Sequence, residues 1–109
     1  MKLPDENRAF IPKTKLIDYV LSETHATGKF KAKFFRNLGF DETNIKLFEK
    51  NIRKMIKLSE VKSTNTSIYG VKYVIEGKIN TPVRNNVIVR TIWIIENKKV
   101  PRFITIYPV

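Results

Sequence analysis

The chain contains no cysteine and only one histidine among its 109 residues. Without thiols it cannot form disulfides or thiolate metal sites, and a single histidine excludes paired-histidine metal sites. A glycine-rich phosphate loop and a dense carboxylate cluster are also missing, so nucleotide-loop and two-metal chemistry have no candidate residues. We therefore expect that any catalysis here uses neither a metal nor a cofactor.

Acidic residues are scarce, because 10 Asp and Glu stand against 21 Lys and Arg. The resulting formal charge is +11 and the sequence pI is about 10.0. Such a charge attracts polyanions, of which nucleic acid is the commonest, followed by acidic proteins and anionic membrane surfaces. A lysine-rich proteome bias explains the same composition without a partner. RNA and an acidic partner protein are the predicted partners; no membrane partner is expected, and the oligomeric state is left open.

Long hydrophobic runs are absent as well. No run approaches the ~18 apolar residues of a membrane-spanning helix, and the first residues lack the apolar core of a signal peptide. These features predict a cytoplasmic protein. Hydrophobic residues make up 42% of the chain, which suits one domain with its own core over residues 1–109.

The two halves of the chain differ in hydrophobic periodicity. Helical spacing dominates residues 12–59, and strand alternation dominates residues 61–109. This segregation predicts an α+β fold, with about three N-terminal helices on an antiparallel sheet of three to four strands.

Three helices are expected in the first half. One begins at Pro12 and turns Leu16, Tyr19 and Val20 inward; the second is capped by Thr27 or Gly28 and ends at Gly39. Asp41 caps the third. The expected buried residues are Phe30, Phe34, Phe35 and Leu38 in the second helix and Ile45, Phe48, Ile52, Met55 and Ile56 in the third.

Three strands are expected in the second half, after a polar connection over residues 63–67. The first covers residues 69–76. The second covers residues 87–95 and is so rich in β-branched residues that a central strand buried on both faces is expected. The last covers residues 103–107.

Histidine is the side chain best suited to acid–base chemistry near neutral pH, so His25 is the first catalytic candidate. It precedes the expected helix start at Gly28, whose free N–H groups, with Lys29 and Lys31, could receive an anion. Lys33 and Arg36 extend this cationic surface. The alternatives are an ordinary loop histidine and a solvated helix face.

The second half adds a charge and two hydroxyls. Arg90 lies inside the expected central strand, where it either pairs with a carboxylate such as Glu76 or Glu96 or points into an anion site. Thr105 and Tyr107 are two residues apart and so share one face of the last strand. They could bind a phosphate or simply make cross-strand contacts.

Nearly the whole chain resembles a small, uncharacterised bacterial domain family. The matching stretches are His25-x-x-Gly28-x-x-Lys31-Ala32-x-Phe34-Phe35, Leu38-Gly39-Phe40, Arg90-Thr91-x-Trp93 and Pro101-Arg102-x-x-Thr105-x-Tyr107-Pro108. The order of helices, basic sheet and a final Thr-x-Tyr-Pro strand is also similar, more loosely, to the barnase–EndoU–colicin–RelE group of metal-independent toxin ribonucleases.

The looser resemblance implies an endoribonuclease, the toxin of a toxin–antitoxin or polymorphic toxin system, restrained by an acidic antitoxin or immunity protein. By position it implies catalytic roles for His25, Lys31, Arg90, Thr105 and Tyr107, and no metal. The RNA-binding candidates are Lys29, Lys33, Arg36, Lys72 and Arg102. The alternative is a non-catalytic basic module that binds RNA, a ribosome or an acidic protein. Convergence of the catalytic candidates in one site would favour the enzyme.

Overall fold

The computed structural model describes residues 1–24 and 29–109. The first segment contains a 3₁₀ turn, η1 (Glu6–Arg8), a short helix, α1 (Lys13–Lys15), and a π-helix, η2 (Leu16–Val20). The second contains α2 (Lys29–Asn37), a 3₁₀ turn, η3 (Glu42–Asn44), and α3 (Ile45–Leu58). Four strands follow: β1 (Val61–Ser67), β2 (Gly70–Ile79), β3 (Val87–Ile95) and β4 (Arg102–Pro108). The predicted α+β order, helices first and sheet second, is confirmed.

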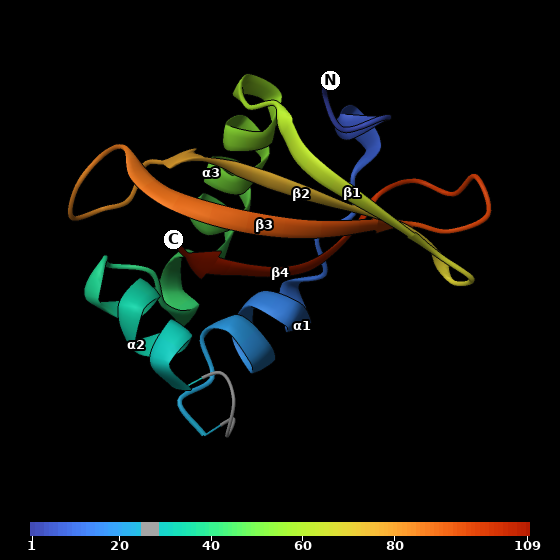
Figure 1. Ribbon diagram of the computed structural model, residues 1–109. Coiled ribbons are helices and arrows are strands. Elements are labelled where there is room, and N and C mark those ends of the chain that lie inside the picture. The colour runs from blue at the N-terminus through green and yellow to red at the C-terminus, as the bar shows by residue number, and fades with distance from the viewer. Residues whose placement is uncertain (25–28) are drawn as a thin grey trace.

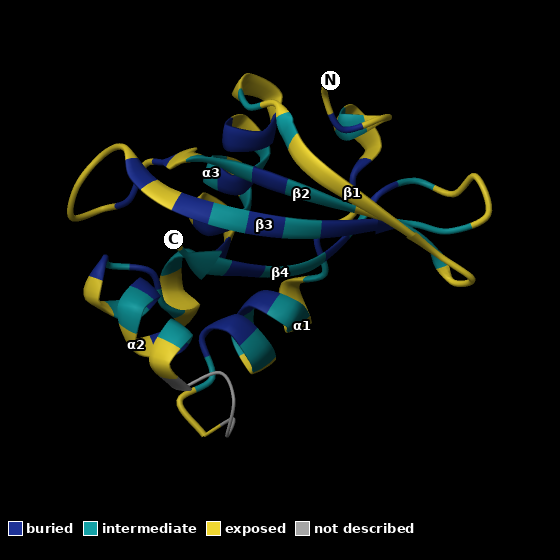
Figure 2. Cartoon of the chain, in the orientation of Figure 1, coloured by how far each residue is buried: buried dark blue, intermediate teal, exposed yellow. Residues whose placement is uncertain are grey.

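The four strands form one antiparallel sheet in the order β1-β2-β3-β4. Figure 1 shows α3 passing behind the sheet, while α1 and α2 lie along the β4 side. Side chains of α3 share a hydrophobic core with Ile75, Ile79 and Trp93 from the sheet. Among the described residues, no helix lies over the middle of the opposite side of the sheet, and we call that side the open face (Figure 2).

Of the predicted elements, α3 agrees best with the structure, both in where its helical segment starts and in which residues it buries. Asp41 caps η3, the 3₁₀ turn that runs directly into α3, through a capping box: its side chain accepts the Thr43 amide at 2.8 Å, and its own amide donates to the Asn44 side chain at 2.9 Å. Such a box satisfies N–H groups that the helix itself leaves unpaired. All five expected core residues are buried: Ile45, Phe48, Ile52, Met55 and Ile56.

The turn between α2 and α3 forms as expected at Gly39. Its φ of 95° lies in the region that favours glycine, and a Cβ there would sit 2.8 Å from the Pro82 side chain. Phe40 then stacks on Phe48 with ring centroids 4.2 Å apart. The turn therefore holds α2 and α3 against the loop that follows β2.

Three expectations were wrong. Residues 63–67 are part of β1 and not a connection, because the backbone of this polar segment pairs with β2. The β3 strand is buried on one face but only in part on the other, where Ile88 is 48% exposed and Ile94 is buried. Phe30 is 77% exposed and Phe34 only partly buried, whereas Phe35 and Leu38 are buried as expected. The expected caps Thr27 and Gly28 lie outside the described residues.

Candidate functional site

Strand register places the candidate residues of the sheet on the open face. Alternate side chains point to opposite faces, and the core side of β3 holds Val89, Thr91 and Trp93. Arg90 therefore points to the open face. Its β2 partner is Glu76 and its β4 partner is Tyr107, so the three side chains form one row across the sheet.

The row is joined by a hydrogen-bonded ion pair. The Nη2 of Arg90 donates to Glu76 Oε2 at 2.8 Å, and Lys62 of β1 donates to the same oxygen at 2.7 Å. The Arg90 guanidinium carbon lies 5.9 Å from the centre of the Tyr107 ring. Of the two partners that the sequence left open for Arg90, Glu76 is the one that the structure selects.

These contacts shift both charged groups toward their ionised forms. Hydrogen bonds from Lys62 and then Arg90 lower the pKa of Glu76. The Glu76 carboxylate, followed by Tyr107, raises the pKa of Arg90. The Nε donor of Arg90 is unused, because this buried atom has no hydrogen-bond partner in the described part of the chain. Glu76 thus holds the guanidinium in place without occupying every donor.

Lys31 reaches this row from α2. Its Nζ donates to the Thr105 hydroxyl at 3.0 Å, and it lies 5.0 Å from the centre of the Tyr19 ring and 5.8 Å from that of Tyr107. The ammonium group is therefore held between two aromatic rings, each of which attracts a cation. We call Lys31, Arg90, Thr105 and Tyr107 the open-face cluster.

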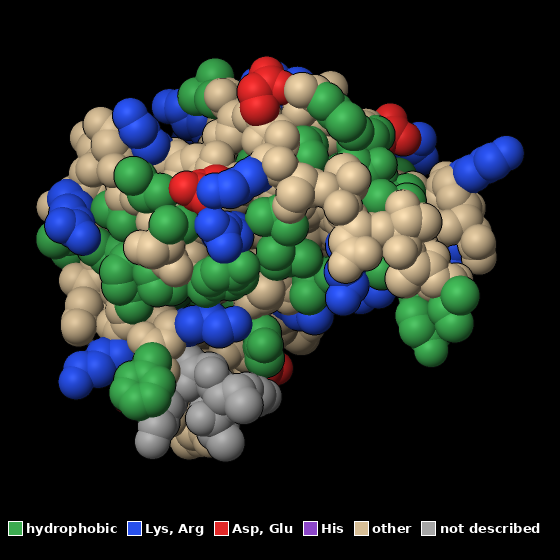
Figure 3. Space-filling view, in the orientation of Figure 1, with side chains coloured by type: hydrophobic (Ala, Val, Ile, Leu, Met, Phe, Trp, Pro, Cys, Tyr) green, Lys and Arg blue, Asp and Glu red, His purple; other side chains and the backbone are tan. Residues whose placement is uncertain are grey.

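The cluster suits a bound phosphate. Two cations and two hydroxyls come together from α2, β3 and β4, and all four residues are partly exposed. Figure 3 shows Lys and Arg side chains spread over this side of the molecule, with hydrophobic side chains between them. An ammonium, a guanidinium and hydroxyls are the groups that bind phosphate oxygens and stabilise the charge that develops on them.

Two predicted residues are not placed by the structure. His25 lies outside the described residues, so its catalytic role stays a prediction. The helix that it precedes begins at Lys29, but the Lys29 side chain is not described either.

The remaining predicted RNA-binding residues lie in different settings. Lys33 is exposed on α2 and Lys72 is exposed on β2. Arg102 pairs with Glu96 at 2.7 Å, and this contact lowers the pKa of Glu96. Lys33 and Lys72 are thus available at the surface, whereas Arg102 already has an anionic partner.

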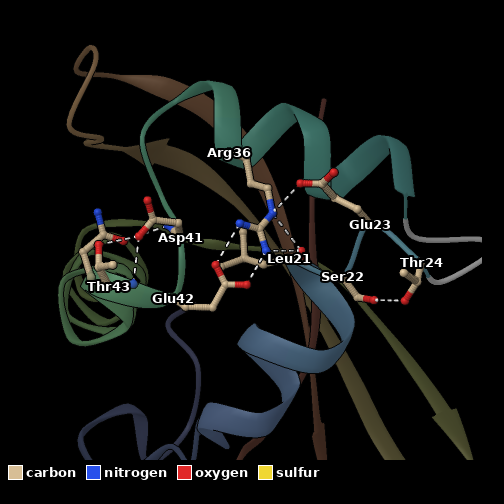
Figure 4. A network of polar contacts seen from close by, with 9 residues as sticks. Leu21, Ser22, Glu23, Thr24, Arg36, Asp41, Glu42 and Thr43 are labelled. Carbon is tan, nitrogen blue, oxygen red and sulfur yellow. Dashed lines mark hydrogen bonds and ion pairs between the residues drawn. The ribbon is translucent and has the colours of Figure 1, made fainter.

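Arg36 is engaged in a structural network (Figure 4). Its Nε and Nη2 donate to the Leu21 carbonyl at 3.0 and 2.8 Å, and Nη1 donates to Glu42 at 2.8 Å. Glu23 lies 3.0 Å from Nε. Arg36 therefore ties α2 to the end of η2 and to η3. Binding of RNA by Arg36 stays a prediction, one that would require it to exchange these partners.

Tyr19 contacts the open-face cluster, although its spacing in the sequence predicted only a place in the core. It is half-buried on η2, and Lys15 also lies over its ring at 5.7 Å. Lys15 donates to the Ile104 carbonyl of β4 at 3.3 Å. In the sequence, the one sign of this contact is that cations stand at helical spacing from Tyr19. That spacing does not show that the ring turns toward Lys31.

No group of three or more His, Asp or Glu side chains that could hold a metal ion occurs among the residues that the structure describes. The helices in the same part of the chain are too short or too polar to cross a membrane.

Comparison with solved structures gives a match to a chain from a contact-dependent growth inhibition toxin–immunity protein complex of Klebsiella pneumoniae 342. The TM-score is 0.72 at 18% identity, over 91% of this chain and 98% of that chain. At this identity the likeness establishes a shared fold. Comparison with curated proteins found no match. The model of the domain of unknown function DUF6883 matches residues 2–109, and the chain belongs to that family.

Proposed function

We propose that this domain is a metal-independent endoribonuclease that acts as a toxin. The observation that carries the proposal is the convergence of Lys31, Arg90, Thr105 and Tyr107 on the open face. They come from three elements and from positions up to 76 residues apart in the chain, yet they meet around one point of the sheet. A non-catalytic surface does not require cations and hydroxyls to meet in this way.

In the proposed reaction, RNA is cleaved by its own 2′-hydroxyl. His25 takes the proton from this hydroxyl, whose oxygen then bonds to the adjacent phosphorus. Lys31 and Arg90 stabilise the negative charge of the pentavalent phosphorane. The bond from phosphorus to the 5′-oxygen breaks, and Tyr107 or Thr105 orients the phosphate or assists the leaving oxygen. The products are a 2′,3′-cyclic phosphate and a 5′-hydroxyl, so DNA is not a substrate.

An acidic immunity protein or antitoxin is the proposed partner. The cluster is cationic, and a ribonuclease inside its own producing cell has to be covered. The similar fold in a toxin–immunity protein complex supports this partner. We expect its Asp and Glu side chains to face Lys31, Arg90 and Arg102, because complementary charge speeds association and fixes orientation.

The second candidate function is a basic module that binds RNA without cutting it. It is favoured by the ion pair of Arg90 with Glu76 at 2.8 Å, which gives Arg90 a structural role in the sheet. Under this reading the open-face cluster binds phosphates but performs no proton transfer.

Cleavage assays on His25→Ala and Arg90→Ala separate the two functions. We expect each variant to cleave RNA about 100-fold more slowly or worse, as loss of a general base or a charge-stabilising contact does, while still binding RNA. Cleavage by the wild type should persist in EDTA. A fully active His25→Ala protein would contradict the mechanism, and wild-type binding without cleavage would favour the module.

A further inference from the structure

A groove follows the outer edge of β2, beside the open-face cluster. Its volume is about 420 Å³, which falls within the range of small-molecule sites. Glu76, Gly77 and Lys78 all line it. Since successive strand residues point to opposite faces, a groove that touches all three must run along the strand's edge. We call it the edge groove.

The groove exists because β1 is shorter than β2. Pairing between them covers β2 from Gly70 to Ile75 and stops there. Beyond Ile75 the second wall comes from α3, where Lys54, Met55 and Leu58 line the groove. The helix lies very close to the strand at Gly77, because a Cβ there would stand 2.2 Å from Ser59 Oγ and 3.1 Å from Met55 Cγ.

The groove combines an apolar surface with amide groups that are already held in place. Met55 is buried, whereas Leu58 is 75% exposed although it is a large apolar residue. Asn51 Nδ2 donates to the backbone carbonyl of Asn80 at 2.8 Å, and the Asn80 side-chain oxygen accepts the backbone N–H of Asn86 at 3.2 Å. Asn51, Asn80 and Asn86 all line the groove. An apolar surface suits the flat face of a base, and asparagine amides supply the donor and acceptor pairs that read base edges.

The groove also has cations without carboxylate partners. Lys54 and Lys78 are exposed, and neither forms an ion pair within the described part of the chain. The one carboxylate in the lining, Glu76, is already neutralised by Lys62 and Arg90. An anion in the groove therefore meets free positive charge.

Glu76 connects the groove to the open-face cluster, because it lines the groove and also holds Arg90. Neighbouring strands lie ~4.8 Å apart, so the groove begins about one strand away from Arg90. We propose that the edge groove binds one nucleotide of the RNA strand, next to the phosphate held by the cluster. This inference rests on the proposed function for its substrate class, but it is tested by binding alone.

The test is a nuclear magnetic resonance titration of ¹⁵N-labelled full-length protein. The probes are the four nucleoside 5′-monophosphates, each added separately, and inorganic phosphate. We expect the backbone amides of Leu58, Gly77 and Lys78 and the side-chain amides of Asn51 and Asn86 to shift with at least one nucleotide. Phosphate alone should shift them less, because it offers no base to the apolar wall.

Substitutions on α3 complete the test. Lys54→Gln should weaken the response of the groove about three- to fivefold, as expected for one surface charge contact, and Leu58→Ser should also weaken it. Lys57→Gln removes an equal charge from the same helix at an exposed position that does not line the groove, so it should leave the response unchanged. Groove signals that respond to nucleotides and follow this pattern support the inference.

The inference is overturned if nucleotides shift only the open-face cluster, or if phosphate alone reproduces every groove shift. It is also overturned if a short extended peptide, tested as an added strand along β2, shifts the groove where nucleotides do not. RNA cleavage is measured separately on wild-type protein. Cleavage without nucleotide shifts contradicts the groove alone, and shifts without cleavage contradict the proposed ribonuclease alone.

Discussion

The Lys31 ammonium donates to the Thr105 hydroxyl at 3.0 Å, although 74 residues separate them in the chain. Helix α2 supplies the cation and β4 supplies the acceptor. The rings of Tyr19 and Tyr107 contact the same ammonium. Together with the hydrogen bond to Thr105, these contacts fix its position. A cation held in this way needs little rearrangement before it stabilises charge on a phosphate.

Replacing Lys31 with alanine is expected to lower the rate of RNA cleavage about 100-fold, the usual cost of removing one preorganised charge contact. The melting temperature should change little, because Lys31 is only partly buried. Lys33→Ala is the matched control, since it removes an exposed lysine two residues along α2. Its cleavage rate at saturating RNA should stay within about twofold of wild type. Equal losses in both variants would show that Lys31 contributes only general charge.

Affinity for single-stranded RNA should fall steeply as salt is added. If the cluster and the surface lysines neutralise about five phosphates, the slope of log affinity against log salt is near −3.5. Fluorescence anisotropy with a labelled oligonucleotide, at several salt concentrations, measures this slope. A flat response would contradict both the ribonuclease and the RNA-binding module, and would leave the charge of +11 as compositional bias.

The fold was predictable where periodicity and capping agree. In α3, the spacing of Ile45, Phe48, Ile52, Met55 and Ile56 predicted the buried face, and Asp41 predicted the start. By contrast, β1 is polar and almost entirely exposed, so its side chains carry no strand signal. It is a strand because its backbone pairs with β2, a tertiary effect that overrides local propensity.

The candidate site was predictable in its residue types and only partly in its contacts. Two-residue spacing placed Thr105 and Tyr107 on one face, and a charge inside a β-branched strand marked Arg90. Strand register decides that Arg90 faces Glu76 and not Glu96. Register depends on the lengths of the turns, which the sequence alone did not fix. The contact of Tyr19 with Lys31 joins two helices whose relative placement depends on the whole core.

The stability of the protein should depend on the ionisation of Glu42. The hydrogen bond from Arg36 lowers the pKa of Glu42 from 4.5 to about 2. Between these values the unfolded chain binds more protons than the folded one, so stability from this pair is complete above about pH 4.5 and is lost as pH falls toward 2. Glu42→Gln should therefore lower the free energy of unfolding at pH 7 and make no difference near pH 2.

Urea denaturation of wild-type and Glu42→Gln protein at several pH values checks this expectation. Asp18→Asn, which alters an exposed carboxylate without an ion pair in the described contacts, is the control. A difference between Glu42→Gln and wild type that stays constant from pH 7 to pH 2 would show that the Arg36 pair is not its cause.

A buried hydroxyl links β3 to β2 and should matter for stability. Thr91 is fully buried; its hydroxyl accepts the Trp93 indole N–H at 2.9 Å and donates to the Ile75 carbonyl at 3.2 Å. Thr91→Val leaves both partners unsatisfied in the core, which should cost roughly 1–3 kcal/mol for each such group. Thr66→Val on exposed β1 should change stability by less than about 0.5 kcal/mol. Equal effects in thermal denaturation would contradict this account of the core.

The most direct test of the proposed function is end-group analysis of RNA incubated with the purified domain in EDTA. The account predicts that wild-type protein yields fragments with 2′,3′-cyclic phosphate and 5′-hydroxyl ends, and leaves DNA of the same sequence intact. It also predicts that a Lys31→Ala, Arg90→Ala double variant yields almost none of these fragments while remaining folded. Intact total cellular RNA after incubation with wild-type protein, or equal cleavage by the double variant, would contradict the claim that the open-face cluster is a ribonuclease site.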